Sequence, residues 1–227
     1  WRNKAMLLKE GLEKGFVEPT EYTKRLTIDG ITKPYQIYKI RLDQLFYNDQ
    51  NDRIATWINK YKEEHDIEHF ENYDDDYNEI IEKFIYESNS KAIDKTQKNI
   101  ELVGQREAGV VLNDGRVIDG NRRYTCLRRL YNNGNSHRHF EAVILDRDIN
   151  VNKKEIKLLE LSIQHGEEGK VDYNPIDRLV GLYNDVIKNK LITPEEYQQT
   201  VNESKSSINK KMEQANLMVE FLEFIGA

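Results

Sequence analysis

The sequence has few cysteines, no long apolar run and no excess of positive charge, and each of these absences excludes a class of protein. Its 227 residues include one cysteine, Cys126, which excludes an internal disulfide and fits a reducing compartment. No apolar run approaches the ~20 residues that a membrane-spanning helix needs. There are 34 basic and 40 acidic residues, and the net charge of −6 argues against a protein that coats nucleic acid by bulk charge. We therefore expect a cytoplasmic protein with no membrane partner.

The composition is very polar for a chain of this length. Charged residues make up 33% and hydrophobic residues 38%, and the mean hydropathy is −0.80. The length suits one or two domains. The low apolar content predicts exposed helices or an extended shape. Because the chain opens on Trp1, we also expect a fragment of a longer protein.

Residue spacing predicts an α+β protein whose last third is helical. Residues 1–18 are expected to form a helix, and Asp29-Gly30 joins two strands within residues 26–42 as a hairpin turn. Further helices are predicted at 54–62, 76–88, 94–103 and 121–132, and strands at 109–112, 116–118 and 140–145. Beyond 151, helices are predicted to begin near Asn152, Asn174, Thr193 and Ser204, and a separate last helix to carry Leu217 to Ile225. In the second of these, apolar residues from Ile176 to Ile187 predict a buried face.

The most informative segment runs from a strand into a helix through Asp119-Gly120-Asn121-Arg122-Arg123. Arginine in the first turn of a helix is unfavourable by about 0.3–1 kcal/mol, because the helix N-terminus carries partial positive charge. An anion at that position would reverse the effect. We expect Arg122 and Arg123 to bind phosphate, Gly120 to allow close backbone approach, and Asn121 to cap the helix. Asp119 would orient an arginine or hold a metal. The alternative is a plain strand-to-helix turn with surface arginines.

This segment resembles the ParB/sulfiredoxin-like superfamily, in which a strand is followed by Gly-x-Arg-Arg and a helix. The resemblance covers roughly residues 37–212. It implies a small mixed β-sheet domain at 37–150 with a helical insertion at about 55–90. An N-terminal extension, 1–36, would precede it, and a helical, helix-turn-helix-like module, 151–227, would follow.

The resemblance also implies ligands and further site residues. In ParB-like proteins a nucleoside triphosphate, here CTP or ATP with magnesium, binds at the junction of the two parts. Arg53 matches a family arginine near that pocket, and Gly104 and Gln105 would contact the base or sugar through their backbone. Glu160 and Gln164 fall on the segment that helps to hold magnesium and triphosphate. Asp119, Glu160 and Gln164 are thus the candidates for any catalytic role, and no metal site is assigned with a full ligand set.

The sequence departs from both branches of the family. Ser162 and His165 stand where ParB proteins have asparagine and arginine, which puts CTP specificity and hydrolysis in doubt. Sulfiredoxins place their catalytic cysteine within the glycine–arginine turn, whereas Cys126 lies a full turn into the helix, where we expect it to be buried. The spacing from Asp119 to Leu127 also resembles an element of DUF262-type defence nucleases. His65 and His69 have the spacing of a zinc pair but lack a third ligand, so a solvated face is expected.

The helices after Thr193 resemble a helix-turn-helix, whose second helix would contact DNA. The residues suited to phosphate or base contacts are Lys205, Ser206, Ser207, Asn209 and Lys210. Residues 192–227 nevertheless hold six acidic residues and three lysines, which disfavours tight DNA binding. The alternative is a helical packing module or homodimer.

Three classes of function remain open. The first, implied by the resemblance, is a bacterial or phage protein that binds nucleotide and DNA, with slow hydrolysis at most because no base is evident. The second is an enzyme, a nuclease or a phosphotransferase. The third is a regulatory protein-interaction module that binds no nucleotide.

Overall fold

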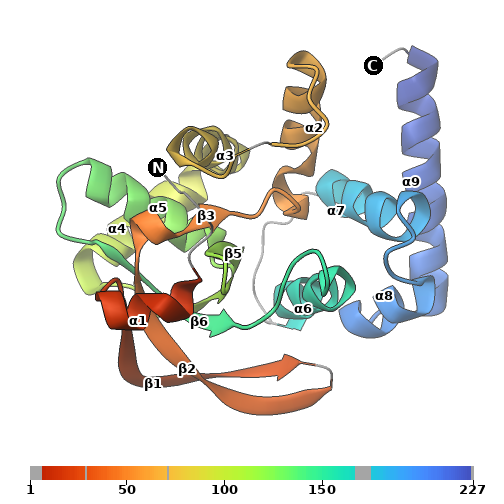
Figure 1. Cartoon of the computed structure of the whole chain (residues 1–227). Helices are drawn as coiled ribbons and strands as arrows, with labels where there is room; N and C mark the ends of the chain where they lie inside the picture. The colour runs from red at the N-terminus through yellow and green to blue at the C-terminus, as the bar shows by residue number, and fades with distance from the viewer. Residues whose placement is uncertain (1–6, 29, 71, 167–174, 226–227) are drawn as a thin grey trace.

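The fold is organised around one mixed six-stranded sheet with helices on both faces, in agreement with the α+β expectation (Figure 1). The structure is a computed structural model and describes residues 7–28, 30–70, 72–166 and 175–225. The strands are β1 (Val17–Ile28), β2 (Ile31–Arg41), β3 (Phe46–Tyr47), β4 (Gly109–Leu112), β5 (Arg116–Asp119) and β6 (His139–Leu145). They lie in the order β1-β2-β6-β4-β5-β3.

Strand pairing brings the middle of the chain to the centre of the sheet. The hairpin β1–β2 pairs antiparallel from Val17 opposite Ile40 to Ile28 opposite Ile31. Strand β6 pairs antiparallel with β2 and parallel with β4. Strand β5 pairs antiparallel with β4 and parallel with β3. The start of β4 therefore lies beside the end of β5, at the edge where the candidate phosphate motif begins.

The helices fall into three groups along the chain. Short turns η1 (Leu8–Glu10) and α1 (Gly11–Lys14) precede the sheet, and η2 (Leu42–Gln44) joins β2 to β3. Between β3 and β4 lie η3 (Asp52–Ile54), α2 (Ala55–Glu64), α3 (Asp75–Ser88) and α4 (Ser90–Val103), and α5 (Asn121–Asn132) follows β5. After β6 come α6 (Lys153–Gly166), α7 (Pro175–Leu182), a π-helical stretch η4 (Tyr183–Lys188), α8 (Pro194–Val201) and α9 (Lys205–Ile225).

Alternating side chains of the central strands feed two separate cores, as strand geometry requires. Val111 packs with α3, α4 and α5 on one face. Val110 and Leu112 pack on the other face with Ile156 and Leu159 of α6. A third core joins α6 to the last helices; its buried members are Leu161, Leu182, Val186, Ile192, Tyr197, Val201 and Ile208. Helix α6 is thus shared between the sheet and the C-terminal helices.

Three expectations about secondary structure are wrong. The helix predicted over 1–18 is limited, within the described residues, to η1 and α1, because β1 begins at Val17. The two last helices are one, since α9 runs unbroken from Lys205 to Ile225. The predicted buried face of α7 is rotated: Ile176 is 54% exposed, whereas Asp177 and Leu182 are buried. Within the described residues, no helix is long and apolar enough to cross a membrane.

Candidate anion site at the start of helix α5

The strand-to-helix turn is built around a glycine that no other residue replaces without strain. Gly120 has φ +95° and ψ +18°, a left-handed conformation that L side chains rarely adopt. A Cβ atom added there would lie 2.9 Å from Cζ of Phe140 and 3.0 Å from Nη2 of Arg123. The helix begins at once, since the backbone N–H of Tyr124 donates to the carbonyl of Gly120 at 2.9 Å.

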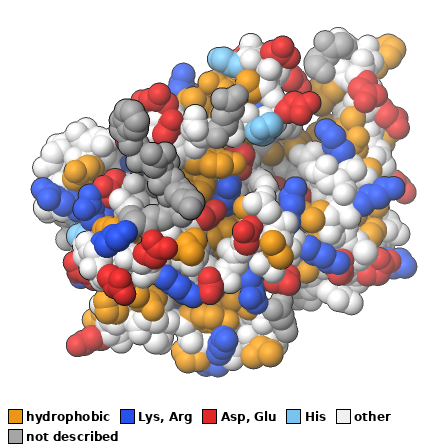
Figure 2. Space-filling model, viewed as in Figure 1, with side chains coloured by type: hydrophobic (Ala, Val, Ile, Leu, Met, Phe, Trp, Pro, Cys, Tyr) orange, Lys and Arg blue, Asp and Glu red, His pale blue; other side chains and the backbone are white. Residues whose placement is uncertain are grey.

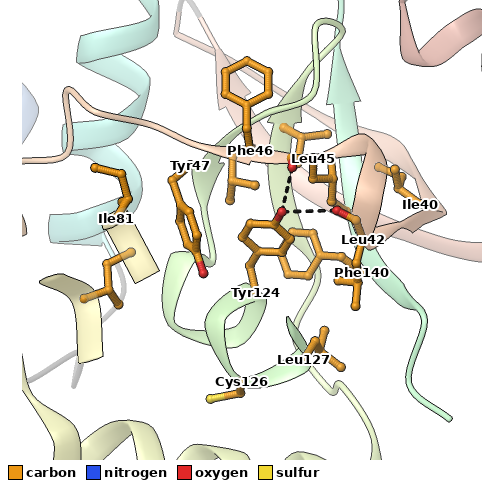
Figure 3. Packing of buried hydrophobic residues seen from close by; sticks show 14 of the residues in the cluster. Ile40, Leu42, Leu45, Phe46, Tyr47, Ile81, Tyr124, Cys126, Leu127 and Phe140 are labelled. Carbon is orange, nitrogen blue, oxygen red and sulfur yellow. Dashed lines mark hydrogen bonds between the residues drawn. The ribbon is translucent and has the colours of Figure 1, made fainter. Parts of the chain in front are cut away.

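The inner side of α5 fixes this turn against the sheet. The buried hydroxyl of Tyr124 donates to the carbonyls of Leu45 at 2.7 Å and Leu42 at 3.2 Å (Figure 3). Thr125, also buried, shares a 2.9 Å hydrogen bond with the hydroxyl of Tyr47. These neighbours hold the first turn of α5 in one orientation. Arg122 and Arg123 are consequently on its half-buried side.

Asp119 orients an arginine, one of the two roles expected for it. Nη2 of Arg123 donates to Oδ2 of Asp119 at 3.2 Å. The same carboxylate oxygen lies 3.5 Å from Nζ of Lys24, a residue on β1 that the sequence did not single out. Lys24 also donates to the carbonyl of Ala108 at 2.7 Å. Because all three charged side chains are at most 16% exposed, the cluster is fixed rather than solvated.

The helix start itself carries no protein cap. Asn121 is the first helical residue, and Gly120 occupies the cap position without a side-chain hydrogen bond, so the expectation that Asn121 caps the helix is wrong. The first turn contains no acidic residue. Oδ1 of Asn121 and Nε of Arg123 are both buried and have no hydrogen-bond partner in the structure. The first N–H groups of a helix have no intrahelical acceptor, so this end is suited to an external anion.

Gly104 and Gln105 lie at the same edge of the sheet but differ in what they offer a ligand. Gly104 ends α4 with φ +75°. The side chain of Gln105 is already used: Nε2 donates to the carbonyls of Glu107 and Glu141, and Oε1 accepts from the N–H of Glu141. A ligand could therefore contact only the backbone of this turn. The proposed contact of Gly104 and Gln105 with a base or sugar is of this kind and stays a prediction.

A second group of charges is buried where η3 meets α6 and η4, and we call Asp52, Lys157, Glu160 and Asp185 the junction cluster. Nζ of Lys157 lies 2.7 Å from Oδ1 of Asp52, 3.1 Å from Oδ2 of Asp185 and 3.8 Å from Oε2 of Glu160. All four residues are at most 8% exposed. Gly181 of α7 packs on this cluster so closely that a Cβ would lie 2.6 Å from Cγ of Asp52.

The electrostatics of the junction cluster are those of three acids around one cation. Burial raises the pKa of Glu160 to about 8, against the opposing effect of Lys157. Burial also raises the pKa of Asp185 to about 6. Burial disfavours the charged form of Lys157, but Asp52 and the other two carboxylates raise its pKa well above the ordinary value. The surrounding carboxylates therefore favour the charged form of Lys157, and burial favours the protonated form of Glu160.

The junction cluster changes the roles that we expect for Glu160 and Arg53. Glu160 is buried beside Lys157 rather than exposed at a helix end. Arg53 is electrostatically linked to it, since Arg53 lowers the pKa of Glu160. The side chain of Gln164 lies outside the described residues. Sequence reasoning missed Lys157, although its position one turn before Glu160 on α6 was a usable signal.

The predicted DNA-contacting residues lie at the start of α9. Helix α8 ends at Val201 and is capped by Asn202, whose φ is +54°, and α9 starts three residues after this cap at Lys205. Lys205, Ser206, Asn209 and Lys210 are exposed. Ser207 differs, because its hydroxyl donates to Glu203 at 2.7 Å.

Two further expectations are confirmed. Cys126 is 0% exposed, and its thiol donates to the carbonyl of Ile93 at 3.5 Å. Burial raises the pKa of this thiol to about 12, which suppresses the reactive thiolate. His65 and His69 lie on an exposed surface, as expected, and His65 stacks on Tyr61.

Comparison with models of protein families finds no match, and comparison with curated proteins finds no significant one.

Proposed function

We propose that this protein binds the phosphate groups of a nucleotide at the start of α5. The observation that carries the proposal is the left-handed Gly120 turn, which presents an uncapped helix N-terminus beside Lys24, Arg122 and Arg123. A cationic first turn opposes the helix macrodipole, whereas a bound oxyanion interacts favourably with both. Planar guanidinium groups match phosphate oxygens in pairs.

The nucleotide and its metal are the finer part of the proposal and rest on the resemblance to ParB-like proteins. A triphosphate such as CTP or ATP would place its base or sugar near Gly104 and Gln105. The described residues do not fit a magnesium ion held by the protein itself, because Asp119 pairs with Arg123 and Glu160 is buried beside Lys157. Magnesium would instead arrive on the nucleotide, and we derive no hydrolytic step.

Titration calorimetry with CTP, ATP, GTP and ADP tests the proposal. We expect saturable binding with one of them, weakened at least about tenfold in Arg123→Ala, since one charge-assisted hydrogen bond is worth about 1.5–3 kcal/mol. Arg122→Ala is a second variant that leaves the Asp119 pair intact. Arg129→Ala is the matched control, because Arg129 lies at the other end of α5, over the Tyr86 ring. The proposal would be overturned if no nucleotide gave heat, or if Arg122→Ala and Arg123→Ala both bound the nucleotide as tightly as the wild-type protein does.

A second candidate function is DNA binding through the start of α9. The three-residue spacing between α8 and α9 and the exposed Lys205 and Lys210 favour it. Fluorescence anisotropy with a DNA duplex across a salt series tests it. We expect Lys205→Ala to weaken binding on all sequences and to reduce the salt slope by about 1. If the chain does not bind the duplex at low salt, this function is excluded. Magnesium-dependent cleavage of the duplex would favour the nuclease alternative.

A further inference from the structure

The last turns of α9 carry several large apolar side chains that remain exposed in the described part of the chain. Leu217 is 64% exposed, Phe221 60%, Phe224 88% and Ile225 52%. Figure 1 shows this end of α9 extending past α7, and Figure 2 shows hydrophobic side chains at the corresponding upper right of the molecule. Exposed apolar side chains scattered singly are ordinary, but a contiguous group of this kind marks an interaction surface.

The group forms one stripe on the face of α9 that points away from the body. Ile208 and Ala215 are buried on the opposite face and anchor the helix. Leu217, Phe221 and Phe224 follow a spacing of four and three residues, which keeps them on one side of a helix. Lys210, seven residues before Leu217, lies on the same side.

We propose that this stripe, from Lys210 to Ile225, is the interface of a homodimer in which two copies of α9 pack antiparallel. Charge supports a second copy as the partner. The first part of α9, 205–211, carries three lysines and no acid, and the second part, 212–225, carries three glutamates and no cation. Lys211 already pairs with Glu203 of its own chain, so Lys205 and Lys210 are the cations that face the other copy. Antiparallel packing sets each basic end beside the acidic end of the other copy and opposes the helix dipoles.

The size of the stripe fits the same partner. A large apolar side chain presents on the order of 150–250 Å², so the exposed fractions amount to roughly 500–600 Å² per copy. Two copies would bury about 1,200 Å² once neighbouring side chains are included, at the lower end of specific interfaces. The dimer is therefore expected to dissociate reversibly on dilution.

Analytical ultracentrifugation of the full chain over a concentration series tests the proposal. We expect a monomer–dimer equilibrium whose dissociation constant rises at least tenfold in Phe221→Glu, which removes an apolar ring and sets a carboxylate level with Glu213 of the other copy. The matched control is Leu102→Glu, because Leu102 is an 82% exposed leucine on α4, and it should leave the equilibrium unchanged. Circular dichroism checks that the helices persist. A wild-type chain that stays monomeric at all concentrations, or a dimer insensitive to Phe221→Glu, overturns the proposal and indicates a different occupant.

Cysteine cross-linking tests the relative orientation of the two α9 helices without changing the charge of the chain. The single native thiol, Cys126, is buried, so Leu217→Cys adds the one reactive thiol, placed near the crossing point of the two helices. We expect oxidation to form a disulfide-linked dimer. Phe224→Cys should not cross-link, because antiparallel packing about Leu217 separates its two copies by about 21 Å along the helix axis, far beyond the roughly 4.4–6.8 Å that a disulfide spans between Cα atoms. Cross-linking through Phe224→Cys but not Leu217→Cys overturns the antiparallel arrangement.

Discussion

The start of α5 and the junction cluster use charge in opposite ways. At α5, cations gather beside an uncapped helix end whose Asn121 Oδ1 and Arg123 Nε have no hydrogen-bond partner. In the junction cluster, three acids surround Lys157, and each residue is at most 8% exposed. We propose the first arrangement as the site of an external ligand, whereas the second packs η3 against α6 and η4. Density of charge alone therefore does not identify a binding site; the feature that distinguishes the first region is the uncapped helix end beside its cations.

Removing the lysine of the junction cluster gives the largest expected effect. Lys157→Met leaves Asp52 and Asp185 buried without their cation, and breaking one side of a buried ion pair costs about 3–5 kcal/mol. Urea denaturation measures this loss. Lys154→Met, on the same helix, removes an exposed pair with Glu196 and should cost about 0–1 kcal/mol. Equal midpoints for the two variants would show that the junction cluster has no special structural weight.

The junction cluster should contribute to the pH dependence of stability, together with Asp177, whose pKa burial raises to about 6. Because burial raises the folded-state pKa of Asp185 to about 6 and of Glu160 to about 8, the folded chain holds protons that the unfolded chain has released. Stability should therefore fall as pH rises from about 5 to 8, by up to about 1.4 kcal/mol per pH unit for each such proton. Chemical denaturation at several pH values measures the slope.

Glu160→Gln separates this effect from other titrations, since glutamine keeps the neutral shape at every pH. We expect the variant to flatten the upper half of the pH profile, between about pH 6 and 8. An unchanged slope would assign the pH dependence to groups outside the junction cluster.

A methyl group at the α5 turn should affect both stability and ligand binding. Gly120→Ala forces alanine into φ +95° and against Phe140 and Arg123, at about 1–3 kcal/mol, and it should also weaken nucleotide binding. Gly134→Ala is the control, because Gly134 has φ +84° but nothing within 4 Å of its added Cβ. We expect the control to cost about 1 kcal/mol and to leave affinity unchanged. Calorimetry and thermal melting of both variants measure the contrast.

Salt gives the smallest expected effect and the simplest separation of the two regions. Raising sodium chloride from about 0.05 to 0.5 M should weaken nucleotide binding several-fold, because the shorter Debye length, which falls from above ~10 Å to below ~8 Å, screens the attraction between the free nucleotide and the cations of the site. The stability difference between Lys157→Met and wild type should not change, since buried charges are screened much less. A salt-insensitive affinity would argue against phosphate as the recognised group.

Local patterns predicted much of the fold. The hairpin signal at Asp29-Gly30, the strand–turn–strand–helix from Gly109 to Asn132 and the helix start at Thr193 are each set by residues close in sequence, and all three regions have the expected structure. The polar residues of β1 gave no alternating pattern before Leu26. Only pairing with β2 makes that segment a strand.

The candidate site was predictable in part. The Gly120 turn and its arginines could be found from their spacing, and the left-handed glycine confirms the turn. Lys24 could not be found, because it reaches Asp119 from a strand 95 residues earlier. The rotated face of α7 had no signal either, since Asp177 and Gly181 are buried by contacts with Thr56 and Asp52, which are far away in the sequence.

The sequence by itself determined local events: the hairpin turn at Asp29-Gly30, the glycine at the start of α5, and the inward position of Cys126. These depend on backbone conformation and on side-chain spacing within a few residues. The tertiary structure alone decided which charges meet. Asp52, Lys157 and Asp185 are far apart in the chain, and only the packing of η3, α6 and η4 removes water from around them. Because water is removed from the junction cluster, its charges act as a structural element. The charges at the start of α5 lie beside an uncapped helix end and remain a candidate binding site.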